Sequence, residues 1–270
     1  MKIRILEKDD QHIQFYVEGI DPAFANSLRR IMISEVPSMT IDEVMIVENT
    51  SALFDEVLSH RLGLIPIVTD LESYVLPSEC ACNGSGCPQC QVILTLNKEA
   101  TEGGMTVYSG DLESQDPKAI PASDKIPIIR LAKGQRLVLE AYARLGTGRE
   151  HAKYQPVSGC SYRYKPIIDI ELDKCEACEE CVKSCPKNIL RQENGTLVLH
   201  DALSCTLCKS CVESCEFDAI HISWDESTFI FNVESTGVLP PSKVVKKSTE
   251  ILEKKAREFI ELVGVAKTER

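Results

Sequence analysis

The sequence predicts an α+β protein with α/β segments at both chain ends, a mainly β middle segment and a small cysteine-organised module. Three observations lead to this prediction. Short β-prone segments and an amphipathic helix open the chain, and a strand and a long helix close it. The segments between are largely β-prone and divided by turn residues. Eight cysteines then follow one spacing twice, offset by 30 residues.

Composition narrows the class of protein. The 270 residues suffice for roughly one large domain or two to three small ones, and 43% are hydrophobic, enough for a packed core. A formal charge of −11 argues against a broad nucleic-acid contact, because affinity for phosphates comes largely from Lys and Arg. The N-terminus has no apolar secretory signal, and no apolar run could span a bilayer. We therefore expect a cytoplasmic protein without a membrane contact.

The chain opens with a predicted hairpin and a helix. Residues 2–8 and 12–18 are β-prone and separated by a polar turn. A helix is expected from Asp21 to Pro37, because Asp21 suits the N-cap, Pro22 suits the first helical position and Pro37 ends the run. Its apolar stripe recurs at steps of three and four residues, at Phe24, Leu28, Ile31 and Met32. Three polar side chains lie beside the stripe: Asn26, Arg29 and Arg30.

A strand and a second helix are expected next. Residues 39–48 alternate in the manner of a strand, and residues 51–67 predict a helix with Ser51 as a possible cap. The apolar face of that helix would consist of Leu53, Val57 and Leu58. His60 could be a ligand or a base, but no catalytic constellation surrounds it. We interpret it as a surface or capping histidine near a helix C-terminus.

Cysteine grouping indicates metal. Thirteen cysteines are many for a cytosolic chain, and in a reducing compartment such density favours metal over disulfides. A first group has the spacing C-x-C-x4-C-x2-C and consists of Cys80, Cys82, Cys87 and Cys90. Four thiolates without a His or Glu between them suit a closed structural Zn²⁺ site. The alternative is a free or disulfide-linked loop. Cys160 has no partner at metal spacing and predicts an ordinary thiol.

The middle segment should be mainly β. Residues 91–96 and 104–108 are β-prone. Residues 110–127 are rich in Ser, Asp and Pro and predict a loop. Strand structure is expected again from residue 128 to residue 146.

Residues 167–223 carry the most specific pattern. Cysteines follow C-x2-C-x2-C-x3-C twice, with apolar segments flanking each run. This spacing resembles that of two-cluster ferredoxins, in which the fourth cysteine of each run binds the other cluster. One [4Fe–4S] cluster is therefore expected on Cys175, Cys178, Cys181 and Cys215. A second is expected on Cys205, Cys208, Cys211 and Cys185. Zinc is the alternative for any single CxxC pair. Glu216 follows the second run where a ferredoxin usually has proline, a departure that bears on Cys215.

The chain closes with a strand and a helix. Phe229, Phe231 and Val233 alternate within residues 226–237 and predict a strand. Pro240 and Pro241 break the chain, and Ser242 can cap the helix. Apolar or small residues then form a seam of the coiled-coil type at Val245, Ser248, Leu252, Ala256, Phe259 and Val263. The alternative is a helix packed on its own domain.

Four motifs carry a resemblance over nearly the whole chain. They are, in order, NSLRRIMISEVP, HRLGLIP, HAKYQPV and FIFNVESTG. They resemble the α-like subunits of cellular RNA polymerases, a family that includes bacterial α, the archaeal D polypeptide and the third-largest polypeptide of eukaryotic polymerase II. The ferredoxin-like insertion points to the archaeal D branch. The resemblance implies an α-like dimerisation domain over residues 1–48 and 224–270, an insert domain over 49–166 and a ferredoxin-like dicluster module over 167–223.

The resemblance also implies a function. We expect a non-catalytic assembly subunit of an archaeal DNA-directed RNA polymerase, a nucleotidyltransferase whose active site lies on other chains. It would form a heterodimer with the small α-like subunit L and recruit subunits N and P and the large catalytic subunit. The dimer face is expected at Leu28, Ile31, Met32, Leu252 and Phe259, and the large-subunit contact at Asn26, Arg29 and Arg30.

Several alternatives stay open. The HAKYQPV loop is where small zinc-bearing subunits dock in relatives, but His151 and Lys153 fit a solvated loop as well. The whole chain could instead be an electron-transfer protein of the dicluster ferredoxin type. A plain zinc-stabilised scaffold is a third interpretation. The clusters could be structural, as metals are in small domains that lack a core, or could link polymerase assembly to redox state.

Overall fold

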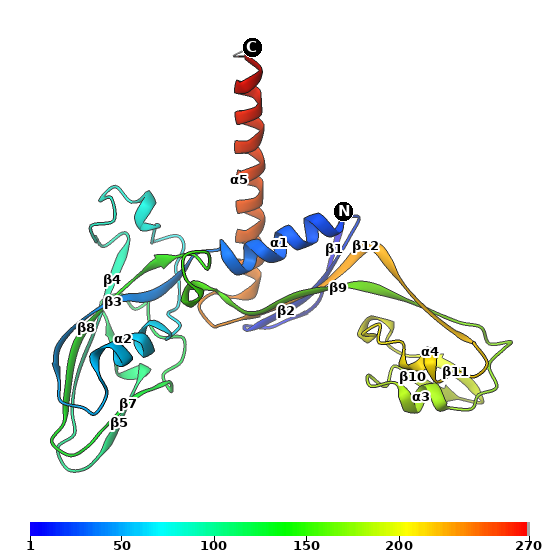
Figure 1. The fold of residues 1–270 in the computed structure, drawn as a ribbon, viewed down its shortest axis with the longest axis horizontal. Helices are drawn as coiled ribbons and strands as arrows, with labels where there is room; N and C mark the ends of the chain where they lie inside the picture. Colours follow the sequence, from blue (N-terminus) through cyan, green and yellow to red (C-terminus); the bar gives the residue numbers. More distant parts are fainter. Residues whose placement is uncertain (269–270) are drawn as a thin grey trace. The chain divides into compact units, whose positions relative to one another are not determined.

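The computed structural model describes residues 1–268, with side chains through residue 264. It is a mixed α+β fold, as expected (Figure 1). Backbone contacts divide the chain into two compact units. The cysteine-repeat unit contains residues 1–6, 14–25 and 162–231, and the main unit contains residues 7–13, 26–161 and 232–268.

One four-stranded sheet has the strand order β1-β2-β12-β9. Its strands are β1 (Lys2–Lys8), β2 (His12–Glu18), β9 (Val157–Ile170) and β12 (Ile220–Ser235). The predicted hairpin at residues 2–18 and the strand at 226–237 are thereby confirmed. Phe229, Phe231 and Val233 are buried as expected, but Ile230 between them is buried as well. This part of β12 is therefore covered on both faces, which simple alternation did not predict.

Helix α1 (Pro22–Ser34) follows the sequence prediction closely. The Asp21 carboxylate accepts a hydrogen bond of 2.7 Å from the backbone N–H of Phe24, which caps the first turn. The helix ends at Ser34, ahead of Pro37. Leu28, Ile31 and Met32 are at most 5% exposed.

A second sheet of the main unit has the order β3-β8-β4-β6. Its strands are β3 (Ser38–Asn49), β8 (Arg136–Gly146), β4 (Gln91–Glu99) and β6 (Glu113–Ser114). Because β3 pairs along most of its length with β8, residues 39–48 belong to the sheet of the middle segment. A further pair joins β5 (Met105–Tyr108) and β7 (Pro127–Leu131). Three 3₁₀ turns complete this part: η1 (Pro77–Glu79), η2 (Ser109–Asp111) and η3 (Ala152–Tyr154). The core beneath is almost entirely aliphatic.

Helix α2 (Asp55–Gly63) packs against β3 and is shorter than predicted. The expected cap at Ser51 is wrong. Its hydroxyl donates to the Asn49 side chain at 2.5 Å, and the helix begins four residues later without a side-chain cap. Leu58 is fully buried and Leu53 partly buried, but Val57 is 44% exposed. His60 is exposed in the last turn, consistent with a surface histidine.

The last helix, α5 (Pro241–Thr268), begins one residue before Ser242. Ser242 therefore lies in the first turn and does not occupy the expected cap position. Val244 and Ser248 are buried, whereas every described side chain from Glu253 to Gly264 is exposed. Residues 269–270, which end the expected dimerisation domain, lie outside the described part of the chain. No helix within residues 1–268 is long and apolar enough to cross a membrane.

The cysteine repeats form two matching halves. The first half contains α3 (Glu180–Ser184) and β10 (Leu190–Glu193), and the second contains η4 (Ala202–Ser204) and α4 (Ser210–Glu213). Strand β10 pairs with β11 (Thr196–Leu199) in a hairpin. Helices α3 and α4 contact each other.

Candidate metal centres and their setting

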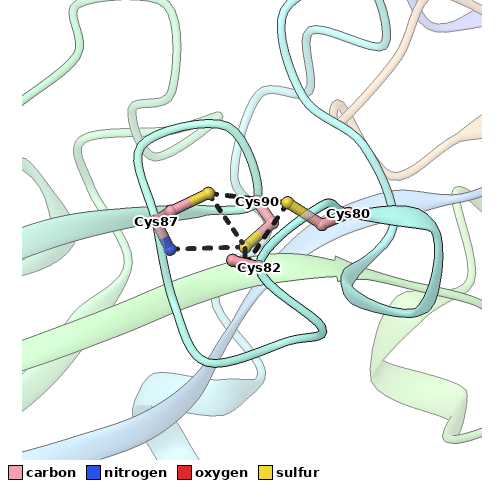
Figure 2. Close-up of side chains that lie close together, drawn as sticks. All are labelled: Cys80, Cys82, Cys87 and Cys90. Atoms are coloured by element: carbon pink, nitrogen blue, oxygen red, sulfur yellow. Dashed lines mark hydrogen bonds between the residues drawn. The ribbon is translucent and has the colours of Figure 1, made fainter.

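The loop from Cys80 to Cys90 brings its four thiols together (Figure 2). The Sγ–Sγ distances are 3.4 Å for Cys80–Cys82 and 3.5 Å for both Cys80–Cys87 and Cys82–Cys90. The distance for Cys87–Cys90 is 3.8 Å. A tetrahedral Zn²⁺ with Zn–S bonds of about 2.3 Å would hold its sulfurs about 3.8 Å apart. The arrangement thus fits a single ion held by four thiolates.

Turn chemistry positions these thiols. Cys90 directly precedes β4, and its backbone N–H donates to the Cys87 carbonyl at 3.0 Å. Gly86 has a φ of +87°, and a Cβ there would lie 2.6 Å from the Gln91 side chain. The turn therefore needs glycine. Hydrogen bonding with the Cys80 and Cys90 thiols lowers the pKa of Cys82 to about 6, which favours a thiolate at Cys82, whereas the pKa values of Cys80 and Cys90 are raised.

The eight repeated cysteines line two cavities. The first cavity is lined by Cys175, Cys178, Cys181 and Cys215. The second cavity is lined by Cys185, Cys205, Cys208 and Cys211. Each cavity thus receives three thiols from one run and the fourth from the other run. These are the groupings that the resemblance to two-cluster ferredoxins implies.

The eight thiols are more widely spaced than those of the Cys80 loop. Within residues 1–268, only the Cys80 loop brings three or more cysteine sulfurs within 4.8 Å of one another. A single ion could not bind all four thiols of either cavity at ordinary Zn–S distances without rearrangement. The donor set and its spacing suit a polynuclear iron–sulfur cluster.

Backbone conformation repeats with the cysteines. Three pairs of residues with positive φ are separated by 30 positions: Ala177 and Leu207, Glu179 and Lys209, Asn188 and Asp218. The Ser184 and Ser214 hydroxyls, also 30 positions apart, lie 2.8 Å from each other and join the halves. Each half therefore folds its cysteine loop in the same way.

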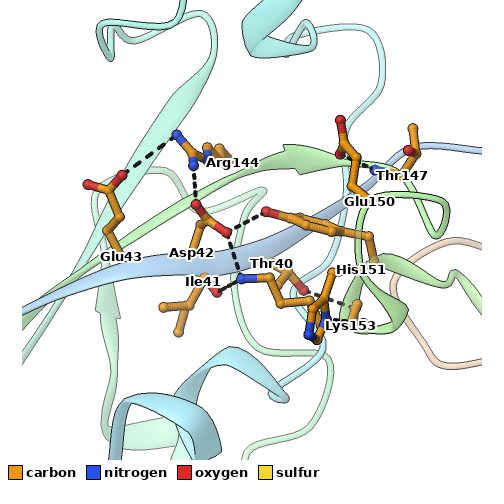
Figure 3. A network of polar contacts seen from close by, with 10 residues as sticks. Thr40, Ile41, Asp42, Glu43, Arg144, Thr147, Glu150, His151 and Lys153 are labelled. Carbon is orange, nitrogen blue, oxygen red and sulfur yellow. Dashed lines mark hydrogen bonds and ion pairs between the residues drawn. The ribbon is translucent and has the colours of Figure 1, made fainter. Parts of the chain in front are cut away.

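A partly buried polar network lies in the main unit (Figure 3). Asp42 on β3 accepts hydrogen bonds from Lys153 Nζ at 2.6 Å and from the Tyr154 hydroxyl at 2.8 Å, and it also pairs with Arg144. Burial opposes ionisation of Asp42, but these partners outweigh burial and lower its pKa. Burial raises the pKa of the Tyr154 hydroxyl, which therefore stays protonated and donates to Asp42. We call this set the Asp42 network.

The Asp42 network corrects one alternative from the sequence. Lys153 is not solvated, since only 15% of its side chain is exposed. His151 is exposed, and its ring accepts a hydrogen bond from the Lys153 backbone N–H. An open groove beside the network is lined by residues of η3 and by Asn83 and Gly84 of the cysteine loop.

The expected interface residues divide into two groups. Leu28, Ile31 and Met32 are buried within this chain. Their side chains therefore expose little surface that a partner could contact without a rearrangement. By contrast, Phe259 is 68% exposed and Leu252 is partly exposed. Arg30 is exposed, and the Arg29 guanidinium donates to the Asn26 side chain at 2.9 Å.

Some residues of interest were not singled out from the sequence. Asp42 and Arg144 were missed because they lie far apart along the chain and no local pattern marks either of them. Arg163 was missed for the same reason, although it binds two carbonyls beside the second cavity. Cys160 is partly buried, and burial raises its pKa to about 11, in agreement with an ordinary thiol.

Comparison with known proteins gives a consistent result. A family model described as the RNA polymerase Rpb3/Rpb11 dimerisation domain matches residues 14–256. A DNA-directed RNA polymerase subunit Rpo3 from Methanosphaera stadtmanae is 46% identical over 98% of this chain and 99% of its own length. The Rpo3 of Archaeoglobus fulgidus is also 46% identical, over 97% of each chain. The Rpo3 of Pyrobaculum arsenaticum is 39% identical over 96% of this chain and 95% of its own.

Proposed function

The chain belongs to the RNA polymerase Rpb3/Rpb11 dimerisation-domain family, and from this membership we propose that it is a non-catalytic assembly subunit of an archaeal DNA-directed RNA polymerase. The observation that carries the proposal is the 46% identity to an Rpo3 subunit over essentially the full length of both chains. An isolated shared domain would not produce such coverage. The active site of the nucleotidyltransferase would lie on other subunits.

The end of α5 supports a heterodimer with the small α-like subunit L. Phe259, Ile260 and Leu262 are 68–72% exposed, although they are large and apolar. Exposed apolar side chains on one long helix are typical of an interaction surface. Leu252, Phe259 and Val263 recur at helical steps and would form the dimer seam. In this proposal Leu28, Ile31 and Met32 support α1 from inside and contribute less contact area than the sequence suggested.

Docking of the other subunits would use polar surfaces. Arg30 is exposed on α1 and would contact the large catalytic subunit, with Asn26 and Arg29 held by their mutual hydrogen bond. The groove between η3 and the cysteine loop would receive a small subunit, N or P. The Asp42 network would keep η3 in place for that contact.

The metal centres would be structural or regulatory parts of this platform. We propose Zn²⁺ on the Cys80 loop and one [4Fe–4S] cluster in each cavity of the repeat. The crossed thiol sets and the repeated backbone conformation support the cluster assignment. The proposed three-part division into dimerisation domain, insert and ferredoxin-like module assigns the clusters to the module alone.

An electron-transfer function is the second candidate, favoured by the two cysteine-lined cavities. An anaerobic pull-down of the tagged chain from the organism that encodes it separates the two. We expect polymerase subunits together with iron, sulfide and zinc in the same sample, with about eight irons per chain for two cubanes. Oxidoreductases in place of polymerase would refute the assembly function. Polymerase without iron would refute only the cluster assignment.

A further inference from the structure

Each of the two cavities has four thiols, but the charged side chains that line them have opposite signs. Among the side chains that the structure describes, Glu176 and Glu179 line the first cavity, and no cation does. Of the same described side chains, Lys187 lines the second cavity, and no carboxylate does. The residues at the matching positions 30 residues away are Thr206, Lys209 and Phe217, so the repeat conserves the thiols and not the charges.

Arg163 adds a half-buried cation on the side of the second cavity. Its Nη1 donates to the carbonyls of Leu203 and Cys205 at 2.7 and 2.9 Å. The guanidinium therefore binds backbone oxygens of the loop that carries Cys205. Burial lowers the pKa of Arg163, and the nearby Cys205 and Asp201 charges oppose that shift. The side chain remains cationic, because an arginine keeps its proton at any pH in the working range.

At the first cavity, no cation within the described part of the chain makes an equivalent contact. There a neutral side chain, Gln192, donates to the carbonyl of Ala177 at 3.2 Å. The residue 30 positions after Gln192 is Ile222, which cannot donate from its side chain. The loop of one half is thus bound by an amide and the loop of the other by a guanidinium.

We propose that these charges make the two clusters electrochemically inequivalent, with the cluster of the second cavity reduced at the higher potential. The inference rests on the cluster assignment made under the proposed function. On reduction a cluster takes one electron from the reductant, no bond breaks, and the net negative charge of the site increases. The potential of a cluster depends on local charge, hydrogen bonds and solvent exposure. A cation beside the second cavity stabilises the reduced form, and carboxylates beside the first destabilise it.

Arg163 should contribute more than the other charges. Glu176, Glu179 and Lys187 are exposed, so dissolved salt weakens their electrostatic interaction with a cluster. The Debye length of this screening is about 8–10 Å in ordinary buffers. Arg163 is only partly exposed and is screened less. High salt should therefore reduce the difference between the reduction potentials of the two clusters without removing it.

An electron paramagnetic resonance titration of the full-length chain, reconstituted anaerobically and reduced with dithionite and mediators, tests the proposal. We expect two one-electron steps. Arg163→Gln should lower the upper step alone, and the double variant Glu176→Gln/Glu179→Gln should raise the lower step alone. Arg191→Gln, which removes an exposed arginine of the same module, is the matched control and should move neither step.

The outcomes separate this inference from the proposed function. A single step of double amplitude, or an Arg163→Gln shift confined to the lower step, would overturn the inference and leave the assembly function intact. Absence of iron and sulfide after reconstitution would overturn both the cluster assignment and the inference. If Arg163→Gln loses a cluster, two other variants still test the inference. Arg163→Lys retains the positive charge and should keep the potential of the upper step, and the glutamate double variant should still raise the potential of the lower step.

Discussion

Replacing Asp42 with asparagine should destabilise the main unit, because it removes a negative charge from a site where the cations Lys153 and Arg144 are partly buried. Asp42 and Lys153 keep 18% and 15% of their side chains exposed, and Arg144 keeps 35%. Removing one partner of a fully buried ion pair lowers the free energy of unfolding by about 3–5 kcal/mol. Since the asparagine oxygen still accepts a hydrogen bond and Arg144 can turn to solvent, we expect a cost at the lower end, about 3 kcal/mol.

Urea denaturation with metals bound, followed by circular dichroism, measures this cost. With an m-value of about 3 kcal/mol per molar urea, the midpoint should fall by about 1 M. The exposed Asp10→Asn is the matched control and should leave the midpoint unchanged. In a double-mutant cycle, Lys153→Met should cost less in the Asp42→Asn background than alone. A midpoint within error of wild type, or additive costs in the cycle, would refute the reasoning.

The loss of stability caused by Asp42→Asn should also depend on pH. The pKa of Asp42 lies below its unfolded value of about 3.9, so ionised Asp42 stabilises the fold at pH values above that. The contribution is lost as pH falls toward the folded pKa. The stability difference between wild type and Asp42→Asn should therefore be constant near neutral pH and shrink below about pH 4. A difference that grows on acidification would contradict this assignment.

Three further predictions concern the metal loop, α5 and a close backbone approach. Cys82→Ser should remove bound zinc and leave the iron content unchanged, as measured by elemental analysis; loss of iron alone would contradict the separation of the sites. Phe259→Asp should weaken binding to the small α-like partner by at least about tenfold in calorimetry, since a central apolar anchor is worth about 2 kcal/mol or more, whereas Glu258→Ala should not. Gly148→Ala should lower the thermal midpoint, because its Cβ would lie 2.3 Å from the Ile33 carbonyl oxygen and overpacking costs about 1–3 kcal/mol; an unchanged midpoint would show that the loop moves freely.

Local signals predicted local structure well. The cap at Asp21 and the end of α1 ahead of Pro37 follow from side-chain chemistry within a few residues. The thiol groupings that line the two cavities are those that the resemblance to two-cluster ferredoxins implies, since spacing alone does not show that the fourth cysteines are exchanged. Ser51 failed as a cap because the helix begins only at Asp55, and the Ser51 hydroxyl instead donates to Asn49 and accepts from the backbone N–H of Leu53.

Long-range pairing could not be predicted. Lys153 looks like a solvated lysine until β3 brings Asp42 beside it from 111 positions away. The apolar stripe of α1 shows that one face is covered, but not whether the cover comes from the same chain or from another. Leu28, Ile31 and Met32 are covered within this chain, whereas the same type of stripe at Phe259 is left open.

The exchange of one cysteine between the halves of the repeat has a consequence for how the module can be damaged. Cys185 belongs by sequence to the first run but lines the second cavity, and Cys215 does the reverse. A cut or a truncation between the runs would therefore leave neither cavity with its full ring of sulfur. Because each half supplies one cysteine to the cavity of the other, the two cavities are retained or lost together.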